Sequence, residues 1–188
     1  YSHPGCGKTF FLIEMGFSIA NGERFLSWDV PAAAGVLHID GEMPPPDMQE
    51  RFRRMARGRS GDRYQYLSVG DLYAAEERSI RINELDSQVR IRKTLDALEK
   101  NNRRPDIIFF DNLSSLSVAD ENDNAAQTDL IEFFLKLRYA GYAVILVHHA
   151  GKSGLQRGAS RREDALDTII NLRKPTVKSS QHQGAEFT

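Results

Sequence analysis

The tripeptide Gly7-Lys8-Thr9 constrains the fold of this chain more than any other feature of its sequence. It stands at the start of residues 8–21, where apolar side chains on more than one side predict a well-buried helix. Gly5 and Gly7 allow backbone N–H groups to turn inward, and the helix N-terminus adds its positive dipole. The segment therefore predicts a phosphate-binding loop of the type G-x-x-x-x-G-K-[ST], with Ser2 in place of the first glycine. The alternative is a glycine turn followed by an accidental Lys-Thr.

Short apolar runs alternate with stretches of helical periodicity along the rest of the chain. The runs predict strands at residues 35–40, 63–69, 106–111 and 142–147, with a short further strand at 169–172. Helices are predicted at 8–21, 47–57, 86–100 and 125–139, and residues 71–84 are ambiguous. This alternation predicts an α/β fold, with a mostly parallel, twisted sheet and helices on both faces.

The length of 188 residues suits one domain. We expect residues 1–175 to form its core and residues 176–188 to be a polar tail, the truncated start of a following segment. A phosphate-binding loop normally follows a buried strand, and the residues before Gly7 leave no room for one. We therefore expect the first core strand to be truncated.

Composition excludes several classes of protein. The formal net charge is −1, so any contact with nucleic acid must come from local basic patches. The single cysteine, Cys6, allows no internal disulfide and indicates a reducing, cytoplasmic location. We interpret Cys6 as a small filler residue, the alternative being a thiol activated at the helix N-terminus. No run of about 18 apolar residues is present, so no membrane span is expected.

Polar side chains directly follow three of the predicted strands. In parallel sheets, ligands bind at the carboxyl ends of the strands, so these residues predict one shared site. Asp111 is placed to hold Mg²⁺, and Glu42 to deprotonate an attacking water molecule. The alternatives are a strand-end aspartate that caps a turn and a solvated loop glutamate. Asp40 is expected to be structural.

Two adjacent histidines end the strand at 142–147. In an extended segment, neighbouring side chains point in opposite directions, so only one of His148 and His149 can reach a phosphate. We favour His149 as the sensor of the γ-phosphate. A zinc site is not supported, because the remaining histidines, His3, His38 and His182, show no ligand spacing.

The chain contains two groups of basic residues. The first lies in a Gly/Ser-rich loop after the histidines and comprises Lys152, Arg157, Arg161 and Arg162. It is either a solvated loop or the source of an arginine finger and of cations that face nucleic acid. The second comprises Arg51, Arg53, Arg54, Arg57, Arg59 and Arg63, and most of it is expected to be solvated.

The order of the motifs P-G-C-G-K-T, I-D-G-E-M-P, F-F-D-N-L and V-H-H-A-G-K…R-G-A-S resembles that of one known family. The chain is similar to the RecA-like P-loop ATPases of the RepA-type hexameric replicative helicase family. These are AAA-type ATPases of plasmids and phages. The resemblance extends from Ser2 to about Lys174. The related DnaB-type helicases also lack the first glycine of the loop.

The resemblance implies ATP and Mg²⁺ as cofactors, with roles for individual residues. Lys8 and Thr9 would bind phosphate and magnesium, Asp111 would be the Walker B aspartate, and Glu42 the catalytic base. His149 would sense the γ-phosphate, and Arg157 would act as a finger across a subunit interface. The remaining nucleotide contacts would come from Pro4, Gly5, Cys6, Gly7, Phe10 and Arg51.

The function that the resemblance implies is ATP hydrolysis by a homo-oligomeric, hexameric ring that works as a replicative helicase on single-stranded DNA. The alternatives are a recombinase-like filament ATPase and an ATP-dependent, DNA-associated switch or loader.

Overall fold

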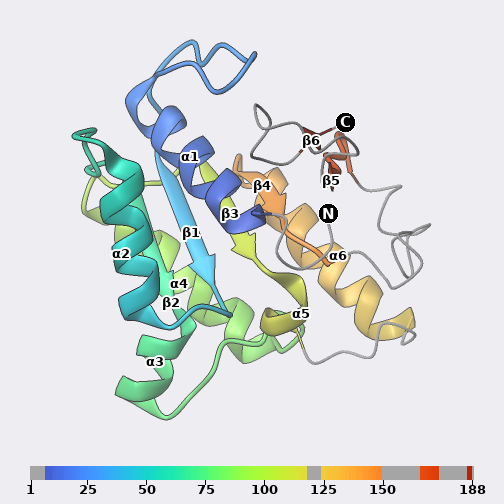
Figure 1. Cartoon of the computed structure of the whole chain (residues 1–188). Coiled ribbons are helices and arrows are strands. Elements are labelled where there is room, and N and C mark those ends of the chain that lie inside the picture. Colours follow the sequence, from blue (N-terminus) through green and yellow to red (C-terminus); the bar gives the residue numbers. More distant parts are fainter. Residues whose placement is uncertain (1–6, 118–123, 150–165, 174–185, 188) are drawn as a thin grey trace.

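A four-stranded parallel sheet forms the centre of the protein, with the strand order β2-β1-β3-β4 (Figure 1). The computed structural model describes residues 7–117, 124–149, 166–173 and 186–187. The strands of the sheet are β1 (Val36–Asp40), β2 (Tyr64–Ser68), β3 (Ile107–Asp111) and β4 (Ala143–Leu146). The predicted α/β class and parallel sheet are confirmed, and each of these strands lies within one of the predicted runs.

Six helices lie in the described residues, one of them before β1 and the others between or after strands. They are α1 (Lys8–Asn21), α2 (Pro45–Ala56), α3 (Val69–Glu76), α4 (Leu85–Lys100), α5 (Leu113–Leu116) and α6 (Asn124–Tyr139). The first part of the ambiguous stretch is helical, because Ser68 caps α3 by accepting a hydrogen bond from the Asp71 N–H. Of the helices in the described part of the chain, none has both the length and the apolar character needed to cross a membrane.

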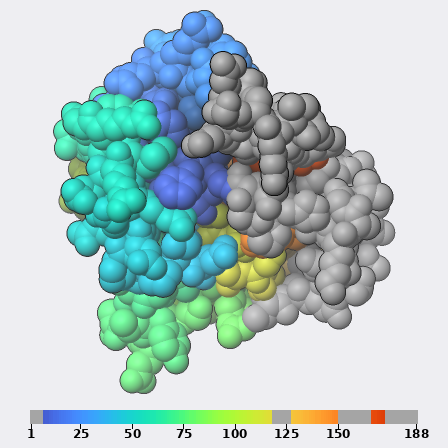
Figure 2. Space-filling model, viewed as in Figure 1, coloured from blue at the N-terminus to red at the C-terminus, as the bar shows by residue number. Residues whose placement is uncertain are grey.

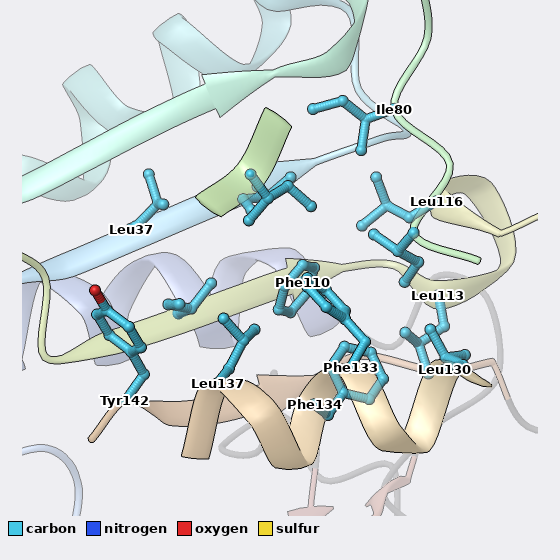
Figure 3. Close-up of a cluster of buried hydrophobic side chains, with 14 of the residues drawn as sticks. Leu37, Ile80, Phe110, Leu113, Leu116, Leu130, Phe133, Phe134, Leu137 and Tyr142 are labelled. Atoms are coloured by element: carbon cyan, nitrogen blue, oxygen red, sulfur yellow. The ribbon is translucent and has the colours of Figure 1, made fainter. Parts of the chain in front are cut away.

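Successive residues of each strand point to opposite faces of the sheet, which creates two cores. One face packs against α1 and α2. The other packs against α4 and α6, and its cluster is shown in Figure 3. In that cluster Phe110, fully buried on β3, contacts Phe133 and Phe134 of α6, with ring centroids 6.3 and 5.3 Å away. Burying one such side chain contributes about 1.5–3 kcal/mol, so these aromatic rings fix α6 against the sheet.

Strand β4 forms one edge of the sheet. Within the described residues β4 pairs only with β3. A cavity of about 690 Å³ runs beside β4, between apolar side chains of α1 such as Leu12 and of α6 such as Phe134.

Two short strands form a separate antiparallel pair. They are β5 (Leu172–Arg173) and β6 (Glu186–Phe187). The predicted last strand at 169–172 therefore begins later than expected, and part of the predicted polar tail pairs with it.

Candidate active site

The carboxyl ends of β1 and β3 lie side by side, which brings the two predicted acidic positions close together. Asp40 is in register with Asp111, and the N–H of Gly41 donates a hydrogen bond of 2.8 Å to the carbonyl oxygen of Asp111. This bond ties the turn after β1 to the end of β3. The turn carries Glu42, which therefore lies beside the residue that follows Asp111.

Three strands contribute to a cluster at this edge. The amide nitrogen of Asn112, after β3, donates a hydrogen bond to Oε2 of Glu42, after β1. The same nitrogen lies 3.0 Å from Nε2 of His149, after β4. Nε2 of His149 is 3.8 Å from Oε2 of Glu42. Of the two histidines at the end of β4, His149 thus joins this cluster, while His148 is buried.

Lys8 brings the start of α1 to the same cluster. Its Nζ lies 3.1 Å from Nδ1 of His149. Lys8 is the first residue of α1, and Gly7 before it has φ 83° and ψ 22°, a left-handed conformation that residues with a side chain rarely adopt. The N–H groups in the first turn of α1 have no partner within the helix, and together with the lysine side chain they lie beside Glu42, Asn112 and His149.

Asn112 is a site residue that the sequence analysis missed. Its Oδ1 accepts hydrogen bonds from the N–H and the hydroxyl of Ser115, at 3.1 and 3.2 Å, and so caps α5. Because the oxygen is engaged there, the amide nitrogen faces Glu42 and His149. The signal available in the sequence was the Asn-x-x-Ser spacing directly after a strand-end aspartate.

The imidazole of His149 faces a donor on each side. Lys8 Nζ approaches Nδ1 and Asn112 Nδ2 approaches Nε2, and both groups can only donate. A neutral imidazole has one acceptor nitrogen, so it can accept from only one of them at a time. A hydrogen-bond acceptor placed between Lys8 and His149, such as a phosphate oxygen, would satisfy both.

Asp40 holds the turn that carries Glu42. Its Oδ1 accepts hydrogen bonds from the N–H groups of Glu42 and Met43, at 3.0 and 3.3 Å, and its Oδ2 accepts one of 2.8 Å from the hydroxyl of Tyr66. Burial raises the pKa of this carboxyl above its ordinary value of 3.8, and the hydrogen bonds oppose that shift. The contacts are those of a residue that shapes the turn, as the sequence analysis expected.

The residues predicted for magnesium fit a hard cation. Asp111 is the last residue of β3, at the carboxyl edge of the sheet, and is almost completely buried. A buried carboxylate is costly unless hydrogen bonds or a cation compensate its charge. Thr9, half-buried on the first turn of α1, offers a hydroxyl. Oxygen ligands of this kind, few in number, are what Mg²⁺ takes from proteins when phosphates supply the rest.

Phe10 and Arg51, two of the predicted nucleotide contacts, touch each other. The guanidinium carbon of Arg51 on α2 lies 4.8 Å from the ring centroid of Phe10 on α1. The Phe10 side chain remains 43% exposed. In Figure 2 the start of α1, in dark blue, reaches the surface beside the cyan and teal segment that contains α2. The pair offers a flat aromatic face near the phosphate-binding loop.

Several predicted site residues lie outside the described residues. These are Pro4, Gly5 and Cys6 of the loop and Arg157, the predicted finger.

Comparisons with known proteins show the family and the fold of the chain. A family model described as an AAA domain matches residues 1–154. Among 137 matching chains of solved structures is a KaiC-like protein from the hyperthermophilic archaeon Pyrococcus horikoshii OT3. It is 14% identical, with a TM-score of 0.58, and the match covers 91% of this chain and 68% of that protein. No curated protein sequence matches the chain.

Proposed function

Because the chain belongs to this AAA domain family and is a P-loop ATPase of RecA-like fold, we propose that it is the ATP-hydrolysing core of an oligomeric motor of the replicative DNA helicase type. The observation that carries the proposal is the meeting of Lys8, Glu42 and His149 at one edge of a parallel sheet. Nucleotides bind at the carboxyl edge of such sheets.

Phosphate binding falls to Lys8 and the start of α1. The ammonium group neutralises charge on the β- and γ-phosphates, and the N–H groups of the first turn point at the same place. Phe10 and Arg51 would stack against the base. The triphosphate would draw Lys8 away from His149, which leaves Asn112 as the donor that faces this imidazole.

Magnesium would be held by the hydroxyl of Thr9 and by the carboxylate of Asp111. When bound, the ion would neutralise negative charge that develops on the phosphates during hydrolysis.

Glu42 is the proposed general base. Its side chain is 51% exposed, so water can reach the carboxylate, and the hydrogen bond from Asn112 fixes its orientation. A positioned base of this kind contributes about 10²–10⁴ in rate.

His149 is the proposed sensor. Once Lys8 binds phosphate, Asn112 remains as the donor to Nε2, so Nε2 accepts and the ring proton lies on Nδ1. Nδ1, the atom that faces Lys8, can then donate to the γ-phosphate. Loss of that phosphate on hydrolysis removes the acceptor, which links the chemistry at the site to the end of β4.

The assignment to a DNA motor is supported by the order of the four sequence motifs, which resembles that of the RepA-type helicases. In such a ring, Arg157 would complete the site of a neighbouring subunit and stabilise the charge of the transition state.

The first experiment tests the ATPase site. Fluorescent ATP binding and phosphate release are measured for the wild-type chain, for Lys8→Ala and for Lys136→Ala, an exposed lysine on α6 that pairs with Glu132. Removing a charge-assisted contact worth about 1.5–3 kcal/mol should weaken binding by about 10- to 150-fold in Lys8→Ala. The Lys136→Ala control should match the wild type. Equal binding in all three proteins would contradict the proposed site.

The second experiment tests the motor. Unwinding of a forked DNA duplex is measured with ATP and with a non-hydrolysable analogue, alongside electron microscopy of the assembled protein. Rings that unwind only with ATP are expected. Filaments would indicate the recombinase-like alternative, and slow hydrolysis without unwinding would indicate a switch or loader.

A further inference from the structure

A histidine stands in the core of the protein, directly behind the predicted magnesium ligand. His38 lies in the middle of β1 and has no solvent exposure. Aromatic rings surround it, with centroids 5.8–6.2 Å away, and they belong to Phe52, Tyr64, Tyr66 and Phe109. An imidazole in such a place requires hydrogen-bond partners, because an unpaired buried polar group is costly.

The two ring nitrogens of His38 face different partners. Nδ1 lies 3.0 Å from the hydroxyl of Tyr64, and Nε2 lies 3.5 Å from Oδ2 of Asp111. Within the described part of the chain, neither Nε2 nor Oδ2 has a hydrogen bond to any other group, and both atoms are enclosed. Each is therefore the group that can satisfy the other.

The partners determine where the ring proton lies. A carboxylate can only accept, so Nε2 of His38 carries the proton and points it at Asp111. Nδ1 must then accept from the hydroxyl of Tyr64. Burial raises the pKa of Tyr64 well above its ordinary value of 10.0, so the phenol keeps the proton that it donates. The three groups therefore form a chain in which the Tyr64 hydroxyl donates to His38 and His38 donates toward Asp111.

A glycine in the middle of α1 makes this line possible. A Cβ atom on Gly16 would lie 2.5 Å from Cζ of Tyr64 and 2.7 Å from its hydroxyl oxygen. Glycine inside a helix is destabilising relative to alanine, so the position is explained by the space that Tyr64 needs.

We propose that His38 is a positioning residue, which holds Oδ2 of Asp111 toward the core so that the other carboxylate oxygen is presented to the metal ion. The inference rests on the proposed function, in which Asp111 helps to hold magnesium. Groups behind a metal ligand fix its orientation, and losing one lowers metal affinity by about 10- to 100-fold. Tyr64 supports the imidazole from the other side.

The test measures metal binding directly, without relying on turnover. Mn²⁺ has the ligand preferences of Mg²⁺ and is paramagnetic, so its binding to the protein with ADP can be followed by electron paramagnetic resonance. Fluorescent ADP binding in EDTA and thermal melting are measured on the same samples. The variants are His38→Leu, which has no donor, and His38→Gln, whose side-chain N–H can replace that of Nε2.

His38→Leu should raise the Kd for Mn²⁺ by about 10-fold or more, while His38→Gln should stay within about threefold of the wild type. Binding of ADP in EDTA should not change in either variant. The inference is overturned if both variants bind Mn²⁺ as the wild type does, or if metal binding and metal-free ADP binding fall in parallel.

A second variant keeps the test decisive if His38→Leu does not fold. Tyr64→Phe keeps the ring against Gly16 and removes the hydroxyl that fixes the imidazole, so the Kd for Mn²⁺ should rise by at least about twofold. An unchanged Kd would overturn the inference. Asp111→Asn separates the two proposals. If Asp111→Asn abolishes Mn²⁺ binding while the His38 variants leave Mn²⁺ binding unchanged, the proposed function stands and this inference fails. A wild-type chain that binds no nucleotide would overturn both proposals.

Discussion

Replacing Asn112 by aspartate would separate two roles that one side chain performs. The amide oxygen of Asn112 caps α5, and its nitrogen donates to Glu42 and approaches His149. Aspartate caps a helix as well as asparagine does, so the contact with Ser115 is kept. The donor, however, becomes an oxygen that faces the carboxylate of Glu42.

The size of the effect follows from the lost contact. A hydrogen bond to a charged group contributes about 1.5–3 kcal/mol, which corresponds to about a 10- to 150-fold lower kcat if it serves to orient the base. Repulsion between the two carboxylates adds to this loss, although the exposure of Glu42 to solvent weakens it. Because the cap is kept, the free energy of unfolding should fall by no more than about 1 kcal/mol, or about 2–4 °C in Tm.

Steady-state phosphate release and thermal melting measure the two effects. Asn101→Asp is the matched control, because its amide donates to the Ala97 carbonyl at the exposed end of α4, away from the site. Turnover of Asn112→Asp within about twofold of the wild type would refute the positioning role, since the contact would then contribute less than about 0.5 kcal/mol. A fall in Tm of more than about 10 °C would instead show that the residue serves the fold.

Three further predictions concern the general base, the hydrophobic core and the buried carboxyl of Asp40. Glu42→Gln should lower phosphate release by about 10²–10⁴ and leave fluorescent ATP binding within about twofold, and unchanged hydrolysis would remove Glu42 as the base. Phe110→Ala should lower the free energy of unfolding in urea by about 3–5 kcal/mol, whereas Tyr139→Ala, at a side chain that is 87% exposed, should change it little. The raised pKa of Asp40 means that the folded chain binds its proton more tightly than the unfolded chain does, so this group makes stability fall as pH rises from 3.8 to the folded-state pKa. Denaturation measured against pH should lose that slope in Asp40→Asn, and a slope that persists would exclude this carboxyl as its source.

Much of the fold could be predicted because its elements are marked locally. Helix α1 was predicted with its observed bounds, since Gly7 and the Asn21-Gly22 pair punctuate it. The run at β3 is almost continuously apolar, as expected for a strand covered on both faces. Helix α3 lies mostly in the stretch that the sequence left ambiguous, because its apolar periodicity is weak. Its start depends on the hydrogen bond by which Ser68 caps it, and that bond leaves no periodic pattern in the sequence.

Only those site residues that stand at the ends of strands could be predicted from the sequence. Glu42, Asp111 and His149 follow strands, and the parallel register brings them to one edge. Asn112 and His38 gain their importance from contacts across strands, which depend on which strands are neighbours. The order β2-β1-β3-β4 places β1 between β2 and β3, so His38 can contact Tyr64 on one side and Asp111 on the other. Nothing in the sequence around His38 indicates that position.

The contact between Lys8 and His149 also bears on how firmly the site can retain its ligand. In the arrangement described above, an incoming triphosphate has to separate these two side chains before it can engage the lysine. Part of its interaction energy is then used to break a contact within the protein, which lowers occupancy at a given ATP concentration. When the phosphates depart, the lysine has a partner to return to, so the same contact favours emptying of the site and suits an enzyme that must exchange its nucleotide in every cycle.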